Sequence, residues 1–459
     1  MEKTFKVAAK RTKKKYDGFS LDIQKNGKFP LLTTSNVVLE DGGLRCGIGL
    51  EKMYNNNWDE IVYDMTQSHV DSVFYLWDRL SGGNGTKVLG YLTETGVFYV
   101  YDETQGQFVK KHSFACPMKM VSTIRREKGK AYYCSMLFGY NGFYMYSTLE
   151  GLVQLSSRSL KPMGCFCGGR AFYTVDGHTV LYSALYEPEK ITLALDQGGS
   201  FTIPSEYGIL TGMETLFDRV YLFFEQEICY VDVRGDARDM RVEKVAYGGG
   251  KIAGKTVKDL SVGGKRAFFM AEDGIYVLNG ERVWRVAKNL DLQIGSVAES
   301  KSATFENSYF VTYTGKDGLR YAVAVDAESE EGFFSVPFLG LCSYAREAFC
   351  AVDGAWHKVT YNGDLPAWAA YEAYSGWTDF DMNGRKTLEQ IELFGEGSCT
   401  VTVQSDEKEK SWDCTFVDGR CVLDTALRGK RFALRFILKK GCKLKGLETT
   451  VQRLQGKFA

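Results

Sequence analysis

Histidine is scarce in this chain of 459 residues, and so are the motifs that usually mark an active site. Only four histidines occur, His69, His112, His178 and His357, and they are widely separated in the sequence. The patterns HExxH and GxSxG are missing, as is a GxGxxG segment that opens a helix. We therefore predict that the histidines are structural, that no catalytic residue is present and that the protein is not an enzyme.

Paired cysteines and long apolar runs are missing as well. None of the 12 cysteines forms a CxxC pair, and most lie inside apolar stretches, as Cys134 and Cys229 do. This pattern predicts reduced, buried thiols, with no disulfide framework, no metal site and no cofactor. No run of 18 apolar residues is present, and no apolar segment follows the basic start of the chain. We expect neither a membrane anchor nor a secretion signal.

Proline is rare, whereas glycine and aromatic residues are abundant. The chain has 7 Pro against 49 Gly, 27 Tyr and 29 Phe. This composition favours strands joined by tight turns over helices, and we predict an all-β fold. Acidic and basic residues balance at 57 each, so the chain as a whole has no general attraction to nucleic acid or acidic lipid.

One pattern recurs along much of the sequence: an apolar strand, a tight turn and a second strand rich in aromatic residues. AEDGIYVLNGERVWRV (271–286) is an example, with a turn at Asp273-Gly274. Such a repeat, at spacings of 35 to 49 residues, is typical of β-propeller blades. We predict a degenerate β-propeller of six to eight blades, with leading strands, at residues 21–367; stacked β-sandwich domains are the alternative. The repeated turns fall at Gly96, Gly142, Gly177, Gln226, Gly274, Gly318 and Gly354.

A different pattern begins after the last of these copies, where short strands follow one another more closely. In KRFALRFIL, Phe432, Leu434, Phe436 and Leu438 lie two residues apart and so share one face. Such spacing is typical of a strand with one face in a core and the other in water. We predict a C-terminal antiparallel β-sandwich at residues 368–459.

The strongest local charge lies at the start of the chain. So many charges with so few apolar residues predict a basic N-terminal arm at residues 1–20 that does not fold by itself. It could dock on an acidic surface of a partner protein or neutralise phosphates of DNA; a solvated tail is the remaining alternative. The basic residues, which have Glu2 as their one acidic neighbour in the first fifteen positions, are Lys3, Lys6, Lys10, Arg11, Lys13, Lys14 and Lys15.

Acidic residues in the repeated turns have two interpretations. Asp176, Asp273 and Asp353 could converge as carboxylates for glycoside hydrolysis. Aspartate also favours tight turns for conformational reasons, and we prefer this interpretation. The tripeptide at residues 234–236, Arg-Gly-Asp, matches an adhesion signal, but a glycine in a hairpin turn explains it without a recognition role.

Three stretches together resemble the tail hub, nozzle and packaged-DNA-stabilisation proteins of bacteriophages. SNVVLEDGGLRCGIGLEKM (35–53) is similar to the opening of these proteins, although Cys46 stands where an arginine is usual. EDGIYVLNGERVWRVAKNLD (272–291) resembles their blade signature, and GWTDFDMNGRKTLEQIELFGEGSCTVTVQSD (376–406) resembles the start of their C-terminal sandwich. The resemblance implies a propeller with added β-domains and no catalytic residues.

The resemblance also implies a mode of assembly. In this family the subunits form a ring, commonly of six, that extends the portal and guides DNA. The expected partners are therefore copies of the same chain, the portal or adaptor, other tail proteins and packaged DNA. We predict a non-enzymatic structural protein in the tail or neck of a phage or phage-like particle, assembled in the host cytoplasm. A carbohydrate-binding or glycan-cleaving propeller and a cellular propeller scaffold are the alternatives.

Overall fold

A computed structural model of the chain consists mainly of β-strands. The described part contains one short 3-10 helix, η1 (Ser205–Tyr207), and no α-helix. The all-β prediction is therefore confirmed. The structure describes residues 11–20, 27–52, 70–78, 86–102, 104–105, 107–127, 130–190, 198–233, 240–260, 264–338, 342–344, 347–352 and 355–453.

The chain divides into two compact units that are built from different numbers of separate segments. Unit 1 combines Met1–Glu51, Phe333–Val336 and Thr360–Ala459. Unit 2 combines Lys52–Gly332 and Pro337–Val359. Unit 1 thus collects segments from three separate parts of the sequence, whereas unit 2 is nearly continuous.

Seven small sheets follow one another between residues 48 and 361. The first three contain β8 (Val70–Asp78), β9 (Thr86–Thr93), β10 (Val97–Asp102) and β11 (Gln107–Ser113); β12 (Met118–Glu127), β13 (Lys130–Gly139), β14 (Gly142–Ser147) and β15 (Gly151–Ser156); and β16 (Gly164–Cys167), β17 (Arg170–Thr174), β18 (Thr179–Tyr182) and β19 (Gly199–Thr202). The fourth and fifth contain β20 (Leu210–Leu216), β21 (Arg219–Phe224), β22 (Ile228–Asp232) and β23 (Val242–Val245); and β24 (Ile252–Asp259), β25 (Ala267–Ala271), β26 (Gly274–Asn279) and β27 (Arg282–Val286). The last two contain β28 (Ile294–Ser296), β29 (Ser302–Phe305), β30 (Ser308–Gly315), β31 (Arg320–Asp326) and β32 (Gly332–Ser335); and β33 (Cys342–Tyr344), β34 (Glu347–Val352) and β35 (Ala355–Tyr361) with β7 (Ile48–Lys52).

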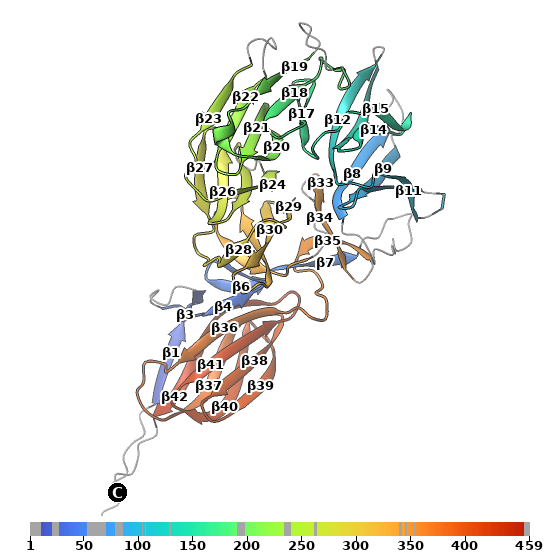
Figure 1. Cartoon of the computed structure of the whole chain (residues 1–459). Coiled ribbons are helices and arrows are strands. Elements are labelled where there is room, and N and C mark those ends of the chain that lie inside the picture. The colour runs from blue at the N-terminus through green and yellow to red at the C-terminus, as the bar shows by residue number, and fades with distance from the viewer. Residues whose placement is uncertain are drawn as a thin grey trace, which may run out of the picture. The chain divides into compact units, whose positions relative to one another are not determined.

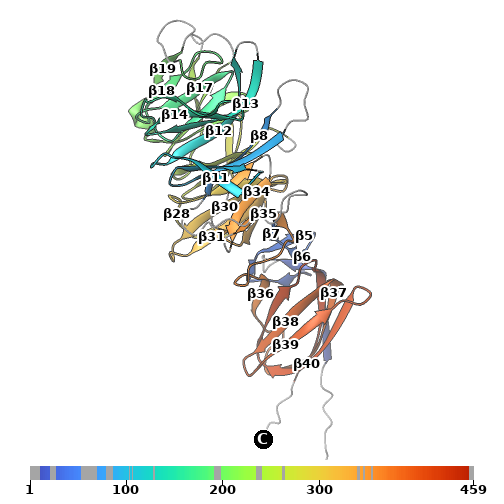
Figure 2. The ribbon, with the colours of Figure 1, turned by 90° about the vertical axis from the view of Figure 1, so that its right-hand side faces the viewer.

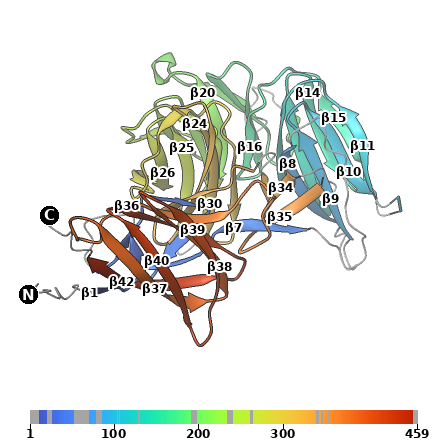
Figure 3. The same ribbon diagram turned by 90° about the horizontal axis from the view of Figure 1, so that it is seen from below.

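The inner strands of the seven sheets contact one another in a closed circle (Figure 1, Figure 3). β8 lies next to β12, β12 next to β16, β16 next to β20 and β20 next to β24. The circle continues through β29 to β33, and β33 contacts β8 again. In Figure 1 the colours accordingly run from blue at β8 through green and yellow to orange at β34. This arrangement of small sheets around a centre is propeller-like.

Apolar residues fill the spaces between neighbouring sheets. One cluster brings Leu92 and Phe98 of the first sheet together with Met120 and Leu137 of the second. Because each sheet has neighbours on both faces, β21 (RVYLFF) buries five consecutive side chains instead of alternating. This packing explains why strands such as β21 and β25 are continuously apolar.

The repeat found in the sequence coincides with one hairpin of each sheet, the one between the second and third strands from the centre. Gly96 and Gly318 have φ angles of 78° and 79° in these hairpins, the left-handed region that favours glycine. The repeated turn therefore lies at the same position, between the second and third strands, in every sheet where it is described. These hairpins contain Gly96, Gly142, Gly177, Gln226, Gly274 and Gly318, while Gly354 lies outside the described residues.

Two larger sheets make up most of unit 1 (Figure 2). The six-stranded sheet has the order β40-β37-β42-β6-β5, with β1 also paired to β42, and the five-stranded sheet has the order β39-β38-β41-β36-β4. A short parallel pair, β2 (Phe19–Ser20) and β3 (Phe29–Pro30), is separate. The bounds are β1 (Arg11–Tyr16), β4 (Thr33–Ser35), β5 (Val37–Glu40), β6 (Gly43–Cys46), β36 (Tyr371–Thr378), β37 (Lys386–Glu396), β38 (Ser398–Ser405), β39 (Glu409–Thr415), β40 (Arg420–Gly429), β41 (Phe432–Leu438) and β42 (Lys443–Arg453).

One hydrophobic core lies between these two sheets. It contains Phe432, Leu434 and Phe436 of β41 in one sheet and Ile391 and Leu393 of β37 in the other. The alternation seen in the sequence thus identified the core face of β41. In β40 the same alternation gives the burial pattern eieBeBeBeB, with Asp424 and Arg428 in water and Leu423 and Leu427 in the core.

The boundaries of the two units differ from those predicted. Residues 21–367 were assigned to the propeller, yet β4, β5 and β6 belong to the sheets of unit 1. Residues 11–16 of the predicted arm are likewise not a free segment but form β1, antiparallel to β42. Lys13 and Glu448, which contact each other in this pairing, are 435 residues apart. Partners at such a distance are selected by tertiary packing and leave no local pattern in the sequence.

Candidate functional site

The predicted basic arm lies partly on β1. This strand pairs with β42 from Arg11 opposite Gln452 to Tyr16 opposite Leu447. Whether its cations contact DNA or a partner stays a prediction. The strand carries Arg11, Lys13, Lys14 and Lys15, while Lys3, Lys6 and Lys10 lie outside the described residues.

Each described cation of β1 has an acidic neighbour within unit 1. The side chains of Arg11 and Lys13 remain 71% and 66% exposed, so such a pair contributes no more than about 1 kcal/mol to stability. The acids nevertheless offset much of the positive charge that the sequence suggested for this strand. The ion pairs are Arg11–Glu389 (2.7 Å), Lys13–Glu448 (2.7 Å), Lys14–Asp381 and Lys15–Asp17 (3.2 Å).

Tyr16 fixes the end of β1 in the core of unit 1. Its side chain is 5% exposed, and its ring packs edge-on against Phe29 with 5.1 Å between the centroids. Lys14 Nζ lies 5.1 Å from the centroid of the Tyr16 ring. Burial raises the pKa of the Tyr16 hydroxyl. One buried aromatic residue among many charges is a weak signal, which is why the sequence did not reveal a strand here.

The described acidic residues that were considered for glycoside chemistry accept structural hydrogen bonds. Asp176 Oδ1 accepts hydrogen bonds from the backbone N–H groups of His178 (2.8 Å) and Thr179 (2.6 Å), which lower the pKa of Asp176 to about 2. Asp273 accepts from the Gly250 N–H at 2.7 Å and from a tyrosine hydroxyl, that of Tyr276, at 2.5 Å. Both carboxylates are occupied by these hydrogen bonds, and the pKa of Asp176 is shifted in the opposite direction to that of a general acid. Asp353 lies outside the described residues, as does the tripeptide at 234–236.

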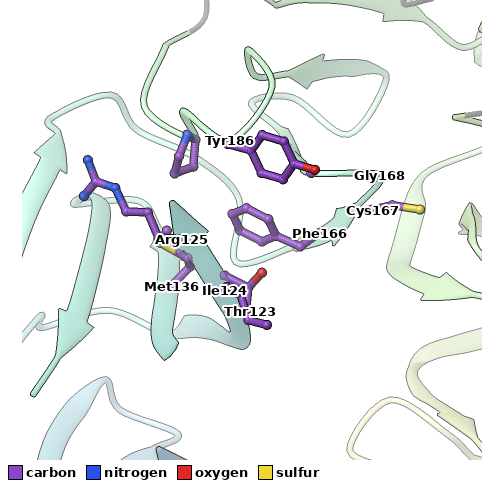
Figure 4. A pocket seen from close by; sticks show the side chains of 10 residues that line it. Thr123, Ile124, Arg125, Met136, Phe166, Cys167, Gly168 and Tyr186 are labelled. Atoms are coloured by element: carbon purple, nitrogen blue, oxygen red, sulfur yellow. The ribbon is translucent and has the colours of Figure 1, made fainter. Parts of the chain in front are cut away.

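A small cavity opens between the second and third sheets of unit 2 (Figure 4). Its volume is about 100 Å³, and Phe166 and Tyr186 line it. The guanidinium of Arg125 points away from these rings, and its Nη2 lies 3.1 Å from Glu189 Oε1. Ligand sites are usually about 300 Å³ or larger, so this cavity is too small for a sugar ring with its contacts.

Charged side chains reach across the circle of inner strands in unit 2. Lys119 on β12 pairs with Glu214 on β20, two sheets further along. Lys301 Nζ, next to β29, lies 2.8 Å from Glu94 Oε1 in the β9–β10 turn. These two ion pairs therefore link sheets of the same chain.

Asn36 is a structural residue whose role the sequence did not reveal. It is fully buried and has a φ of 54°, which asparagine tolerates better than most residues. Its Oδ1 accepts from the Ile48 N–H at 2.8 Å, and its Nδ2 donates to the Ile48 carbonyl at 2.5 Å. Its backbone N–H donates to the Phe334 carbonyl at 2.8 Å, and its carbonyl accepts from the Gly47 N–H at 2.9 Å. One residue thus joins three segments of unit 1.

Searches for other kinds of site add two observations. Among the residues that the structure describes, no group of three His, Cys, Asp or Glu side chains is placed to hold a metal ion. The described chain also has no helix that is long and apolar enough to span a membrane.

Comparison with known proteins gives no family. No family model matches the sequence, and no curated protein matches it. The extracellular domain of a putative one-component system from B. thetaiotaomicron is similar in structure, with 9% identity, a TM-score of 0.43 and coverage of 91% of this chain. The present chain spans 62% of that protein.

Two further solved structures are similar at the same low level. One is BBS1N in complex with ARL6DN, with 8% identity, a TM-score of 0.41 and coverage of 70% of this chain and 98% of the other. The other is a chain of the mitotic checkpoint complex, with 10% identity, a TM-score of 0.37 and coverage of 67% and 98%. Structural similarity at this level gives no information about function.

Proposed function

We propose that the seven small sheets, most of which lie in unit 2, form a seven-bladed β-propeller and that the two larger sheets of unit 1 form a β-sandwich with strands from both parts of the chain. The closed circle of inner strands and the constant phase of the hairpins support the propeller. The single core between two antiparallel sheets supports the sandwich.

On this fold we propose a non-enzymatic, structural role in the tail or neck of a phage or phage-like particle, as one subunit of a ring around the DNA path. The observation that carries the proposal is the structural role of Asn36, which lies in one of the stretches that resemble the phage tail and neck proteins. Asn36 is fully buried, and its side-chain amide forms hydrogen bonds to the backbone of Ile48 on β7. A buried asparagine that holds strands together supports a structural role for this stretch.

The ion pairs inside unit 2 support one detail of this proposal. Lys119–Glu214 and Lys301–Glu94 link sheets across the circle of inner strands. A DNA path is therefore better formed between the subunits of a ring than through the centre of a single chain. Contact of such a ring with packaged DNA would be electrostatic and would weaken steeply as salt is raised.

Native mass spectrometry of the purified full-length protein tests the proposal. We expect one closed oligomer, with six subunits as the number that the resemblance implies, and ring-shaped particles in electron micrographs. The same preparation is then incubated with glycans, esters and a phosphodiester. A strictly monomeric protein, or turnover that is lost on substitution of Asp273, would overturn the proposal.

A further inference from the structure

The core of unit 1 contains a group of cysteines that the proposed function does not use. Cys46, Cys399, Cys414 and Cys442 all belong to this one core and have exposed fractions of 2% or less. All four are free thiols. The sequence predicted buried, reduced cysteines but gave no sign that residues so far apart meet in one place.

Two of these cysteines face each other across neighbouring strands. Cys399 on β38 lies directly opposite Cys414 on β39. Phe416 N donates to the Gly397 carbonyl at 3.1 Å, and the alternation of an antiparallel ladder makes the 399–414 pair a hydrogen-bonded one as well. The Cα atoms of such pairs are about 5.5 Å apart. A disulfide spans about 4.4 to 6.8 Å between Cα atoms, which this spacing meets. It also needs about 3.5 to 4.5 Å between Cβ atoms, whereas opposite Cβ atoms in a ladder are about 4.5 to 5.5 Å apart, so β39 must move slightly towards β38 for the bond to form.

The surrounding thiols make the two cysteines chemically unequal. The neighbouring thiols of Cys414 and Cys442, together with burial, raise the pKa of Cys399. The thiol of Cys399 in turn lowers the pKa of Cys414, against the effect of burial. The thiolate is the nucleophile in disulfide exchange, and Cys414 is the one of the two that lies on the outer strand of the sheet, so we assign it as the sulfur that reacts first.

The position of β39 provides a route for a reagent. In the part of the chain that is described, β39 pairs with β38 alone and is the last strand of its sheet. Its burial pattern is eeeieBe, so Cys414 is its one buried residue. Edge strands open locally at a lower free energy than central strands, and such opening exposes Cys414 without unfolding the unit.

We propose that Cys399 and Cys414 are a redox site that closes to a disulfide in the presence of a small-molecule disulfide. The Cys414 thiolate attacks one sulfur of the reagent, forms a mixed disulfide and releases the other half as a thiol. The Cys399 thiolate then attacks the Cys414 sulfur, which forms the protein disulfide and releases the second thiol. Each cysteine gives its proton to solvent, and the two electrons lost by the pair reduce the reagent to two thiols.

The product is a covalent link between an edge strand and its neighbour. It holds β39 on β38, so the edge no longer opens at this end. The inference does not depend on the proposed function, because it concerns the core of unit 1 alone.

Oxidised glutathione is the reagent for the test, applied to the full-length native protein and followed by peptide mapping without reduction. We expect a 399–414 linked peptide to form at least tenfold faster than any link that involves Cys229, a buried cysteine of unit 2. We also expect at least tenfold slower amide exchange in β39 after oxidation. Cys414→Ala and Cys399→Ala should each abolish the link, while Cys229→Ala should leave its rate unchanged.

Three results would overturn the inference. The first is that no linked peptide forms while the protein stays folded. The second is a partner of Cys399 other than Cys414. The third is a link that forms only under denaturing conditions. If the alanine variants lose structure, Cys414→Val fills the site instead, and a disulfide between Cys399 and another cysteine that forms equally fast in a folded Cys414→Val protein would equally contradict the assignment.

Discussion

Most strand partners in unit 2 are neighbours in the sequence, whereas several strand partners in unit 1 are remote. In unit 2, Ala271 of β25 pairs with Gly274 of β26 across a two-residue turn. In unit 1, Arg11 of β1 pairs with Gln452 of β42. Closing a short loop costs little conformational entropy, whereas joining the two ends of a chain requires the rest of the unit to hold them together. Local hairpins therefore determine most strand pairs of unit 2, whereas tertiary packing determines the remote strand pairs of unit 1.

The two units also bury their strands differently. The sheets of unit 2 have neighbours on both faces, and β25 is buried at every position. The sheets of unit 1 have one face in the core and one in water, as the alternation in β40 shows. Unit 2 should therefore respond most to backbone changes in its turns, and unit 1 to the loss of remote strands and buried polar groups.

Removal of residues 1–16 tests the remote pairing and has the largest expected effect. It deletes β1 and the buried Tyr16, and the loss of a buried aromatic residue alone costs about 3 to 5 kcal/mol. We expect rapid amide exchange in β42 with little change in β21 or β25. Removal of residues 1–10 is the control and should leave β42 protected. Equal protection in both truncations would show that β1 contributes nothing to unit 1.

Two glycines with nearly the same backbone angle test the hairpins of unit 2. A Cβ on Gly96 would lie 1.9 Å from the Cys116 carbonyl oxygen, whereas one on Gly318 would meet nothing within 4 Å. We expect Gly96→Ala to lower the free energy of unfolding by about 3 kcal/mol or more, because steric overlap adds to the cost of a left-handed φ. Gly318→Ala should cost about 1 kcal/mol, from φ alone. Equal losses in thermal or urea unfolding would mean that close packing around Gly96 is unimportant.

Substitution of Asn36 tests the junction of unit 1. Asn36→Ala removes both side-chain bonds to Ile48 and leaves buried polar groups unpaired, for an expected loss of about 3 kcal/mol. Gln404→Ala removes a similar amide from an exposed position of the same unit and should change stability by less than about 0.5 kcal/mol. The measurement is urea unfolding of both variants. Similar midpoints would contradict a structural role for Asn36.

A buried lysine of unit 1 gives the smallest effect, which depends on pH. Lys386 is fully buried, its Nζ donates to the Lys430 carbonyl at 2.6 Å, and burial lowers its pKa although Asp379 and Asp406 act in the opposite direction. Between this lowered pKa and 10.5, the unfolded chain binds more protons than the folded one, so stability contributed by this group rises with pH across that window.

Lys386→Met removes this contribution and keeps a side chain of similar length. We expect its melting temperature, relative to the wild type, to be higher at neutral pH and to fall as the pH rises towards 10.5. Lys430→Met keeps the carbonyl that Lys386 contacts and serves as the control. A constant difference between Lys386→Met and the wild type over this range would show that Lys386 keeps its ordinary pKa in the folded protein.

The sequence by itself determined the features that depend on neighbours in the chain. Turn residues such as Gly96 and Gly318 marked the hairpins, because their φ angles are local requirements. Spacing of two residues identified the core face of β41. Both features follow from short segments, and both are present in the structure.

Only the tertiary structure decided which remote segments meet. It turned Arg11–Tyr16 of the predicted arm into a strand of unit 1, placed Asn36 at a junction of three segments, and set Cys399 opposite Cys414. It also showed that Asp176 holds its own turn, whereas Asp273 accepts a hydrogen bond from the remote Gly250 N–H. The physical reason is that these contacts join groups through space, and their energies depend on burial and packing that no window of the sequence contains.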